Sequence, residues 1–313
     1  MTTSDVKIYS QKLADILKAH AEWMVNPARG HRCRLHQVTL NEVVMRNARL
    51  SRSVMDGVML VEADLSGADL SGAELNSVDL EGALLSGTDF SHAQFHHVEF
   101  VRGYLSAACF VEAKIDSATF RQARLEEAAF QDATIGHTDF AGAELNRVQF
   151  HGAKLAVCDF SGCKMEEAQL PRVRASRCRF VSASGNEVNF SHGRLKECDL
   201  SGAEMYNARF NNASVEETRL IRANLSGADF REASLAGSDF SRAVLRDAKM
   251  AGASVLGTDF CGADLTDARD LTQQQLGQAR TDTGTILPNG TRGPFIRFSG
   301  SEKSSSSRWR DWS

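Results

Sequence analysis

The sequence predicts an all-β solenoid with four sides per coil, and three observations support that prediction. Every fifth position from Leu35 to Leu265 is Leu, Phe, Met, Ile or Val, with Ala175 and Gly185 as the exceptions. A small residue stands two positions before each of these centres. Glycine is concentrated two positions after them. A period of five matches neither the strand period of two nor the helix period of about 3.6, so we treat the chain as an internal repeat.

Each five-residue unit is expected to form one side of a coil. The centre and the small residue two positions before it share one face, because side chains alternate along an extended strand. The residue between them points outward and is usually Asp, Glu, Arg, Lys or Asn. The other two residues turn the corner, where glycines such as Gly67 and Gly142 tolerate positive φ.

The phenylalanines predict the number of sides. Apart from Phe95, Phe295 and Phe298, every phenylalanine lies at a multiple of ten, and the centres between them are nearly all aliphatic. An alternation of period ten fits a coil of 20 residues with phenylalanine ladders on two opposite sides. A three-sided coil would scatter phenylalanine over every side. We therefore expect four sides and about 12 coils, in a rod of roughly 58 Å at the spacing of stacked strands.

Units such as ADLSG, AELNS, ANLSG and ADFRE resemble those of the pentapeptide-repeat family. The resemblance covers residues 31–270 and implies a right-handed, four-sided parallel β-helix. It also suggests a bacterial protein. It says much less about function, because one fold can carry many functions.

The two ends are expected to carry caps, because the end coils of a solenoid would expose unpaired strands. Residues 1–30 form the predicted N-terminal cap, with an amphipathic α-helix over 5–24 that ends at Asn26-Pro27. Residues 271–295 form the C-terminal cap, with a short helix and Thr272 as its N-cap. Residues 296–313 form a low-complexity tail that we expect to be disordered, with Trp309 and Trp312 as a possible docking motif.

Composition limits the partners and the compartment. The net charge is only −4, so we expect no direct binding of nucleic acid and no membrane partner. The start of the chain lacks the features of a signal peptide, and seven cysteines do not form a disulfide framework. These features predict a reduced, cytoplasmic protein, either a monomer or a homodimer.

The filled core argues against catalysis, because an active site needs a concave pocket in which residues converge. We expect no cofactor and no metal. Cys158, Cys178 and Cys198 stack at intervals of 20, but they occupy the small inward position, as do Cys33 and Cys163. We therefore expect them to pack as small apolar residues rather than to hold a metal or act in redox chemistry.

The histidines are also expected to be surface residues. His92, His96 and His97 lie close together in the sequence, and His97 shares an outer column with His137. Two coils separate that pair, about 9.6 Å at the spacing of stacked strands, which is too far for one metal without a third element.

Outward acidic residues form a predicted column along one wall. Such a ladder is how some relatives are thought to imitate duplex DNA and occupy a type II topoisomerase. Arg179 and Arg219 interrupt the column, and a basic wall with Lys114, Lys154, Arg174 and Arg194 adjoins it. The alternative is that Asp is simply the usual surface residue of the repeat. The candidate residues of the column are Asp79, Glu99, Asp139, Asp159, Asp199, Asp239 and Asp259.

Residues 170–190 depart from the repeat. The centres shrink to Ala175 and Gly185, and Pro171 lies at a corner. The missing volume predicts a dent or bend with a basic patch over it, a candidate binding surface because local departures from the repeat often mark function. The candidate residues of the patch are Arg172, Arg174, Arg177 and Arg179.

These features together predict a non-enzymatic scaffold that binds an unidentified protein on its outer walls. The first alternative is a DNA mimic that inhibits or protects a type II topoisomerase such as gyrase. The repeat has no inserted loops, which are common in family members of that kind. A bacterial effector delivered to another cell remains a third possibility.

Overall fold

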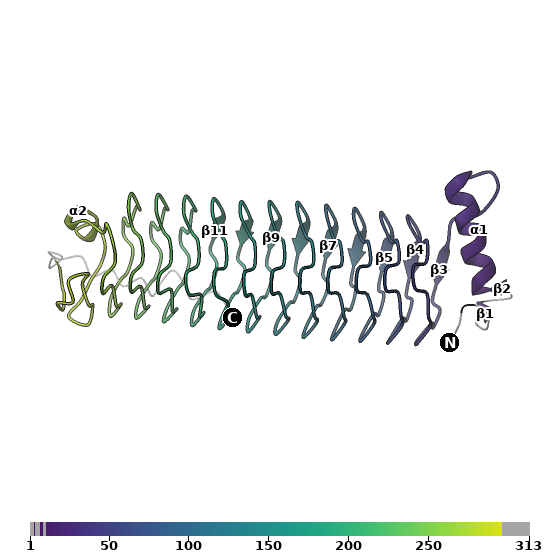
Figure 1. Cartoon of the computed structure of the whole chain (residues 1–313), viewed down its shortest axis with the longest axis horizontal. Helices are drawn as coiled ribbons and strands as arrows, with labels where there is room; N and C mark the ends of the chain where they lie inside the picture. Colours follow the sequence, from purple (N-terminus) through teal and green to yellow (C-terminus); the bar gives the residue numbers. More distant parts are fainter. Residues whose placement is uncertain (1–2, 4–6, 9–10, 296–313) are drawn as a thin grey trace.

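The computed structural model describes residue 3, residues 7–8 and residues 11–295. They form a long rod of stacked coils with a helix against its N-terminal end and an irregular segment over the other end (Figure 1). The N-terminal segment contains β1 (Lys7–Ile8), β2 (Gln11–Lys12) and α1 (Leu13–Val25). The rod contains β3 (Arg34–His36), β4 (Val54–Asp56), β5 (Glu74–Asn76), β6 (Gln94–His96), β7 (Lys114–Asp116), β8 (Thr134–Gly136), β9 (Lys154–Ala156), β10 (Arg174–Ser176) and β11 (Arg194–Lys196), and α2 (Gln273–Leu276) follows it.

Within the described residues, β3 to β11 form one parallel sheet in sequence order. Each residue pairs with the residue 20 positions further on, as Leu35 does with Met55. This register confirms a coil of four five-residue sides. The regular strands span eight turns, fewer than the expected 12 or so, and single bridges to Ser214, Ser234 and Ser254 extend the same wall by three further steps. We call this face the strand wall.

On the other three faces, one residue per coil forms a parallel β-bridge with the residue 20 positions further on. The acidic wall contains the bridge from Asp79 to Glu99. The next face contains the bridge from Leu84 to Tyr104, and we call it the notched wall. The fourth wall contains the bridge from Asp89 to Cys109. The strand wall and the notched wall are therefore opposite faces, because ten residues separate their positions in a coil of 20.

The corners adopt left-handed backbone conformations. Glycine was expected there, and Gly72 has a φ of 62°. Glu42 occupies an equivalent corner with a φ of 57°. Since many non-glycine residues share this conformation, the stacked coils impose it and glycine only lowers its cost.

The core consists of the predicted ladders. Phe110 stacks on Phe130 with ring centroids 4.6 Å apart, and Phe120 stacks on Phe140 at 4.8 Å. The two ladders meet edge to face, as Phe130 and Phe140 do at 6.2 Å. The small inward residues are buried beside them. The interior is therefore a continuous packed column rather than a channel.

The N-terminal helix is shorter than expected. It begins at Leu13 rather than at residue 5, because Lys7 and Ile8 pair antiparallel with Lys12 and Gln11. Its end agrees with the prediction: Asn26 caps it, and the Asn26 N–H donates to the Glu22 carbonyl at 2.9 Å.

The C-terminal segment closes the last coils through side chains. Thr272 caps α2 as expected, in a reciprocal capping box with Gln275. The Gln275 Nε2 donates to the carbonyls of Met250 and Ala253 at 3.1 and 2.8 Å. The Gln275 side chain thus supplies the Ala253 carbonyl with a donor in place of the N–H that a further coil would provide.

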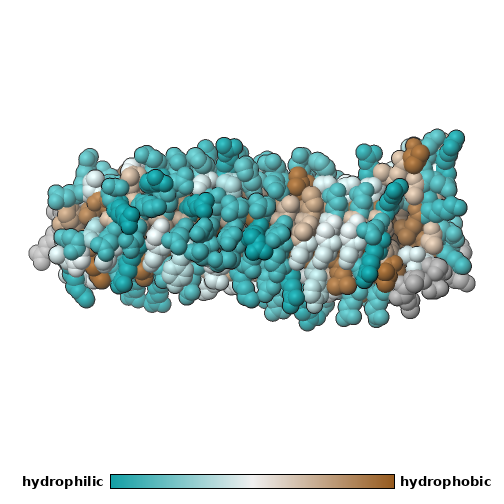
Figure 2. Space-filling view, viewed as in Figure 1, coloured by the Kyte–Doolittle hydropathy of each residue, from teal (hydrophilic) through white to brown (hydrophobic). Residues whose placement is uncertain are grey.

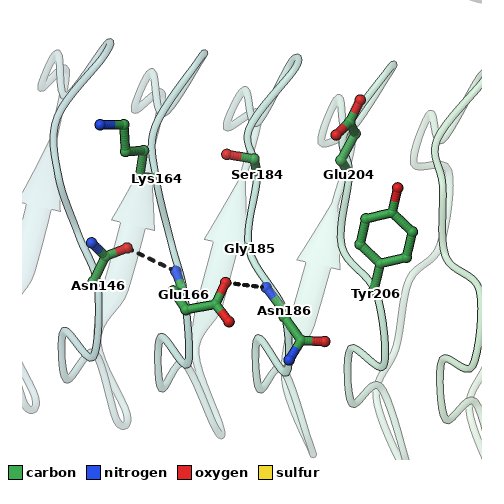
Figure 3. A pocket seen from close by; sticks show the side chains of 8 residues that line it. All are labelled: Asn146, Lys164, Glu166, Ser184, Gly185, Asn186, Glu204 and Tyr206. Atoms are coloured by element: carbon green, nitrogen blue, oxygen red, sulfur yellow. Dashed lines mark hydrogen bonds between the residues drawn. The ribbon is translucent and has the colours of Figure 1, made fainter.

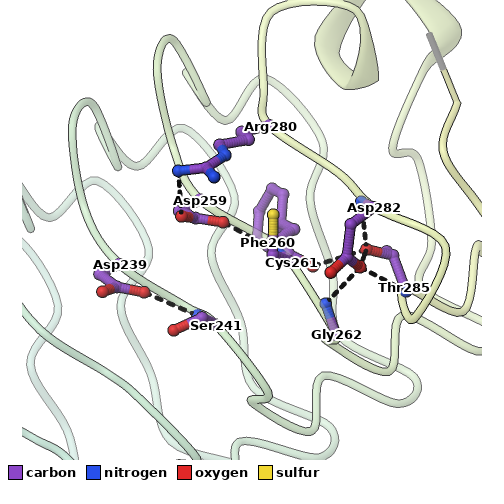
Figure 4. Close-up of polar contacts among 9 residues, drawn as sticks. All are labelled: Asp239, Ser241, Asp259, Phe260, Cys261, Gly262, Arg280, Asp282 and Thr285. Atoms are coloured by element: carbon purple, nitrogen blue, oxygen red, sulfur yellow. Dashed lines mark hydrogen bonds and ion pairs between the residues drawn. The ribbon is translucent and has the colours of Figure 1, made fainter. Parts of the chain in front are cut away.

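A second set of contacts holds the same end (Figure 4). The Asp282 carboxylate accepts the N–H groups of Gly262 and Gly284 at 2.8 and 3.0 Å. The Thr285 hydroxyl donates to the Phe260 carbonyl at 2.9 Å. Residues 282–285 therefore replace the coil that would otherwise stack on this end.

The proposed tail over 296–313, with Trp309 and Trp312, lies outside the described residues. Within the part that the structure describes, none of the helices has the length and apolar character needed to cross a bilayer.

A buried histidine attaches the N-terminal cap to the rod. His20 is fully buried in α1 and stacks on Trp23 with ring centroids 5.5 Å apart. Its Nδ1 accepts the Cys33 N–H at 3.0 Å, so the proton is on Nε2, which donates to the Ser51 carbonyl at 3.0 Å. Burial lowers the pKa of His20 below its ordinary value of 6.5, and Arg32 lowers it further. The ring is therefore neutral in the folded protein at neutral pH.

We expect the attachment of α1 to weaken as the pH falls below about 6.5. The folded pKa lies below the unfolded one, so the unfolded state takes up protons first and stability is lost on acidification. A proton on Nδ1 would also face the Cys33 N–H donor. Hydrogen exchange of the α1 amides at pH 7.5 and 5.5 measures the effect. The variant His20→Gln should lose this pH dependence, and an unchanged dependence in that variant would contradict the assignment.

Candidate interaction surface

The basic side chains of the strand wall come from three neighbouring strands. Lys154 in β9, Arg174 in β10 and Arg194 in β11 are exposed and paired in register. Among the residues that the structure describes, no carboxylate lies within ion-pair distance of these three cations. We call them the cationic column. Like charges directly opposite one another on adjacent strands repel, so the column is locally unfavourable without an anion.

The predicted basic patch is divided between two walls. Arg172 and Arg177 lie at the two corners that flank Arg174, with φ of 58° and 52°. Arg179 lies on the acidic wall, bridged to Asp159 on one side, and its Nε is 3.7 Å from an Asp159 carboxylate oxygen. All four arginines are exposed, as expected. The four arginines lie on one coil and so run around the rod. The cationic column, which has no ion-pair partner among the described residues, runs along the rod axis across three coils.

The predicted acidic column exists as a geometric feature. Parallel bridges connect Asp79 to Glu99, Asp139 to Asp159, and Asp239 to Asp259. Thr119, Arg179 and Arg219 occupy the intervening positions of the same column.

The carboxylates of this column take part in local structure. The Asp239 Oδ1 accepts the Ser241 N–H and the Asp259 Oδ1 accepts the Cys261 N–H, both at 2.9 Å (Figure 4). Such side chain-to-backbone bonds stabilise turns. Asp259 also pairs with Arg280 at 3.3 Å. Asp79, Asp139, Asp159 and Asp199 accept the same kind of backbone bond, from the residue two positions on.

The predicted dent is present, but it faces the opposite way from the basic patch. Gly185 lies at the centre of a depression of about 380 Å³ on the notched wall (Figure 3). A Cβ on Gly185 would stand 2.6 Å from the Met165 carbonyl oxygen, so the backbone has moved into the space of the missing side chain. Ala175 lies on the strand wall, half a coil away, and is buried. The expectation of a basic patch over the dent was therefore wrong.

Acidic and aromatic residues surround the depression. Its lining includes Glu166, Glu204 and Tyr206, with Lys164 at one edge. The Glu166 carboxylate accepts the Asn186 N–H at 2.8 Å, and Lys164 pairs with Glu144 at 2.9 Å. The polar groups are thus mostly engaged within the protein.

Sequence reasoning missed a second depression, of about 440 Å³, on the same wall. Leu84 and Tyr104 line it and are 37% and 41% exposed. Arg124 lies over the Tyr104 ring at 5.2 Å from its centroid. In the sequence, this depression is marked by Leu84 and Tyr104, which are large apolar residues at outward positions that are usually charged. Figure 2 shows a mostly hydrophilic face with apolar side chains confined to small areas.

The cysteines are placed as expected for packing. Cys33, Cys158, Cys163, Cys178 and Cys198 are buried, and all seven thiols are free. The Cys163 Sγ donates to the Phe140 carbonyl at 3.0 Å, as the Thr88 hydroxyl does to the Leu65 carbonyl at 2.9 Å. Burial raises the pKa of Cys163 to about 12 and that of Cys33 to about 11. Cys163 and Cys33 are therefore weak nucleophiles.

His96 and His137 form a surface cluster around one carboxylate. His96 Nδ1 and His137 Nδ1 lie 3.3 and 3.1 Å from the two oxygens of Asp116. The hydrogen bond from His137 lowers the pKa of Asp116. The rings of His96 and His97 are 4.2 Å apart. In residues 11–295, no group of three or more His, Cys, Asp or Glu side chains fits a metal ion.

Two family models match most of the repeat. A model described as a pentapeptide repeat region matches residues 73–150. A model described as pentapeptide repeats (8 copies) matches residues 33–72, 143–181, 186–220 and 223–267. No curated protein matches the sequence.

Several solved structures resemble the chain. HetL, a pentapeptide repeat protein involved in heterocyst differentiation regulation from the cyanobacterium Nostoc sp. strain PCC 7120, is 23% identical; the match covers 87% of this chain and 98% of HetL, with a TM-score of 0.31. QnrB1, a plasmid-mediated fluoroquinolone resistance protein, is 17% identical over 59% of this chain and 89% of QnrB1, with a TM-score of 0.29. A pentapeptide repeat protein from the Arabidopsis thaliana thylakoid lumen is 23% identical over 49% of this chain and 85% of that chain, with a TM-score of 0.27.

Proposed function

The chain belongs to the pentapeptide-repeat family, and from that premise we propose that it is a non-enzymatic scaffold that binds a protein partner on its outer walls. One observation supports this most directly: the core is filled from the first coil to the last, so polar side chains point outward along four flat walls. The two depressions are shallow, and their charged groups are largely paired within the rod. A surface of this kind suits recognition of another macromolecule better than chemistry on a small substrate.

The strand wall around β10 is the proposed partner surface. Arg172, Arg174 and Arg177 lie together on one coil, with Lys154 and Arg194 on the coils beside it. This is the densest group of unpaired cations on the strand wall of the described rod. The free thiols agree with a reducing compartment, and we place the scaffold in the cytoplasm.

Affinity capture from the native cytoplasm tests the proposal. The bait is the wild-type chain, beside a variant in which Arg172, Arg174, Arg177 and Arg179 become Ser. The matched control changes four arginines that are ion-paired within the rod: Arg102, Arg121, Arg147 and Arg246. We expect the wild type and the control to retain a partner that the patch variant loses. Substrate turnover that a point change on the rod abolishes would contradict the scaffold proposal.

The aligned acidic column supports a second candidate, a DNA mimic that acts on a type II topoisomerase. The column is geometrically continuous over Asp139 and Asp159, but Arg179 and Arg219 interrupt it further on. Ion pairs with Arg121 and Arg280 reduce the negative field at Asp139 and Asp259. We therefore expect micromolar protein to leave gyrase supercoiling unchanged. Inhibition that disappears when the column aspartates become Asn would favour this candidate over the scaffold.

A further inference from the structure

We propose that the cationic column of Lys154, Arg174 and Arg194 is the docking site for an acidic, extended segment of the partner protein. This inference rests on the proposed scaffold function and specifies the chemistry of its partner. It depends on three features of the strand wall: unpaired charge, an open lane beside that charge, and an acidic wall next to it.

The first feature is that, within the described part of the chain, these three cations lack the ion pairs that other cations of the rod form with carboxylates one coil away. Elsewhere a cation commonly reaches a carboxylate one coil away, as Arg147 reaches Glu127 at 2.8 Å and Lys164 reaches Glu144 at 2.9 Å. In the cationic column, Arg174 has a cation on both neighbouring coils, and Lys154 and Arg194 each have one on the coil of Arg174. Three like charges at the strand spacing of about 4.8 Å repel one another, and an anionic ligand would relieve that repulsion.

The second feature is the lane beside the column. The other outward positions of β8, β9 and β10 are Gly136, Ala156 and Ser176, which are all small, and the lane ends at Lys196 in β11. Val157, at the edge of this lane, is 42% exposed. An extended chain can therefore lie along the rod axis with its backbone over the lane and its carboxylates against the cations.

The dimensions suit a peptide. The column spans two strand spacings, about 9.6 Å, and carboxylates on alternate residues of an extended peptide recur about every 6.6 Å. Flexible lysine and arginine side chains can bridge the difference, so two or three carboxylates engage the three cations.

The third feature disfavours nucleic acid as the occupant. The acidic wall is one five-residue unit away, and there Asp159 and Asp199 lie on the coils of Lys154 and Arg194, with Arg179 between them. A duplex is broader than one wall, so its phosphates would extend over these carboxylates. A single extended peptide stays within the strand wall and avoids that repulsion.

Fluorescence anisotropy on the full chain tests the proposal. The probe is a labelled peptide of about ten residues that alternates glutamate and serine. Its controls are the glutamine–serine peptide and a double-stranded DNA oligonucleotide of similar length. We expect the acidic peptide to bind with an affinity that falls as salt is raised. We expect the glutamine peptide to bind at least tenfold more weakly.

Two triple variants locate the site. The column variant carries Lys154→Ser, Arg174→Ser and Arg194→Ser, and the control variant carries Arg121→Ser, Arg147→Ser and Arg246→Ser. Both remove three exposed positive charges, but the control residues are ion-paired within the rod. We expect the column variant to lose at least tenfold in affinity and the control to stay within about twofold of the wild type. Equal losses in both variants, or tighter binding of the oligonucleotide than of the acidic peptide, would overturn the proposal.

Thermal unfolding separates binding from a structural role. Removing mutually repelling cations should leave the melting temperature of the column variant unchanged or higher. A lower melting temperature would show that the cations stabilise the rod instead.

If the wild type captures a partner that the column variant also captures, this inference fails while the scaffold stands. If the wild type captures no partner, the scaffold itself fails.

Discussion

The variant Phe140→Ala should lose about 3–5 kcal/mol of unfolding free energy. Phe140 is fully buried and stacks between Phe120 and Phe160 at 4.8 and 4.7 Å. It also meets Phe130 and Phe150 edge to face, both at 6.2 Å. Truncation removes all four ring contacts and leaves a cavity that the stacked coils above and below hold open, so relaxation recovers little of the loss.

Urea unfolding followed by circular dichroism measures this loss, and hydrogen exchange locates it. Each coil is held mainly by its neighbours, so protection should fall first in the coils around residue 140. The control Phe140→Leu keeps most of the volume and should cost clearly less. A loss below about 1 kcal/mol for the alanine variant would mean that the ladder is not the main stabilising element of these coils.

The variant Gly30→Ala should detach the N-terminal cap, at a cost of about 3 kcal/mol, the upper end of the range for overpacking. A Cβ at this position would stand 2.1 Å from the Ala19 carbonyl oxygen and 2.5 Å from the Trp23 backbone nitrogen. Both atoms belong to the backbone of α1, so no side-chain rotation relieves the overlap. The helix or the loop that joins it to the first coil must move.

Hydrogen exchange of the α1 amides reports this detachment directly. The cap hydrogen bonds of His20 to Ser51 and Cys33 should be lost with the helix, and the amides of the first coils should then exchange faster. Arg29→Ala changes an exposed residue of the same loop and should leave protection unchanged. Equal protection in Gly30→Ala and the wild type would show that the loop relaxes without releasing the helix.

Much of the fold could be predicted because the repeat leaves few alternatives. Centres at every fifth residue and phenylalanine at every tenth imply the 20-residue register that the sheet shows. The capping role of Thr272 and the burial of Cys158, Cys178 and Cys198 follow from local pattern in the same way. The start of the N-terminal helix was wrong, since an amphipathic pattern does not show that residues 7–8 pair as a strand.

The candidate surface was predicted less completely, because charge patterns are read along the chain whereas charges interact across coils. Arg172, Arg174, Arg177 and Arg179 are neighbours in sequence, yet Arg179 belongs to the acidic wall and pairs with Asp159. The cationic column, in contrast, brings together residues that are 20 positions apart in the sequence. The role of Asp239 and its equivalents in the turns also depends on backbone geometry that composition does not report.

The sequence by itself determined the four-sided coil, its register and its packed core. The reason is that a strict period of five assigns each side chain either to the core or to the surface. Only the tertiary structure decided that Arg179 pairs with Asp159 on the neighbouring coil, and that His20 joins the cap to the rod. The physical reason is that these features depend on contacts between successive coils and at the rod ends, where the repeat pattern places no constraint on which polar atoms meet.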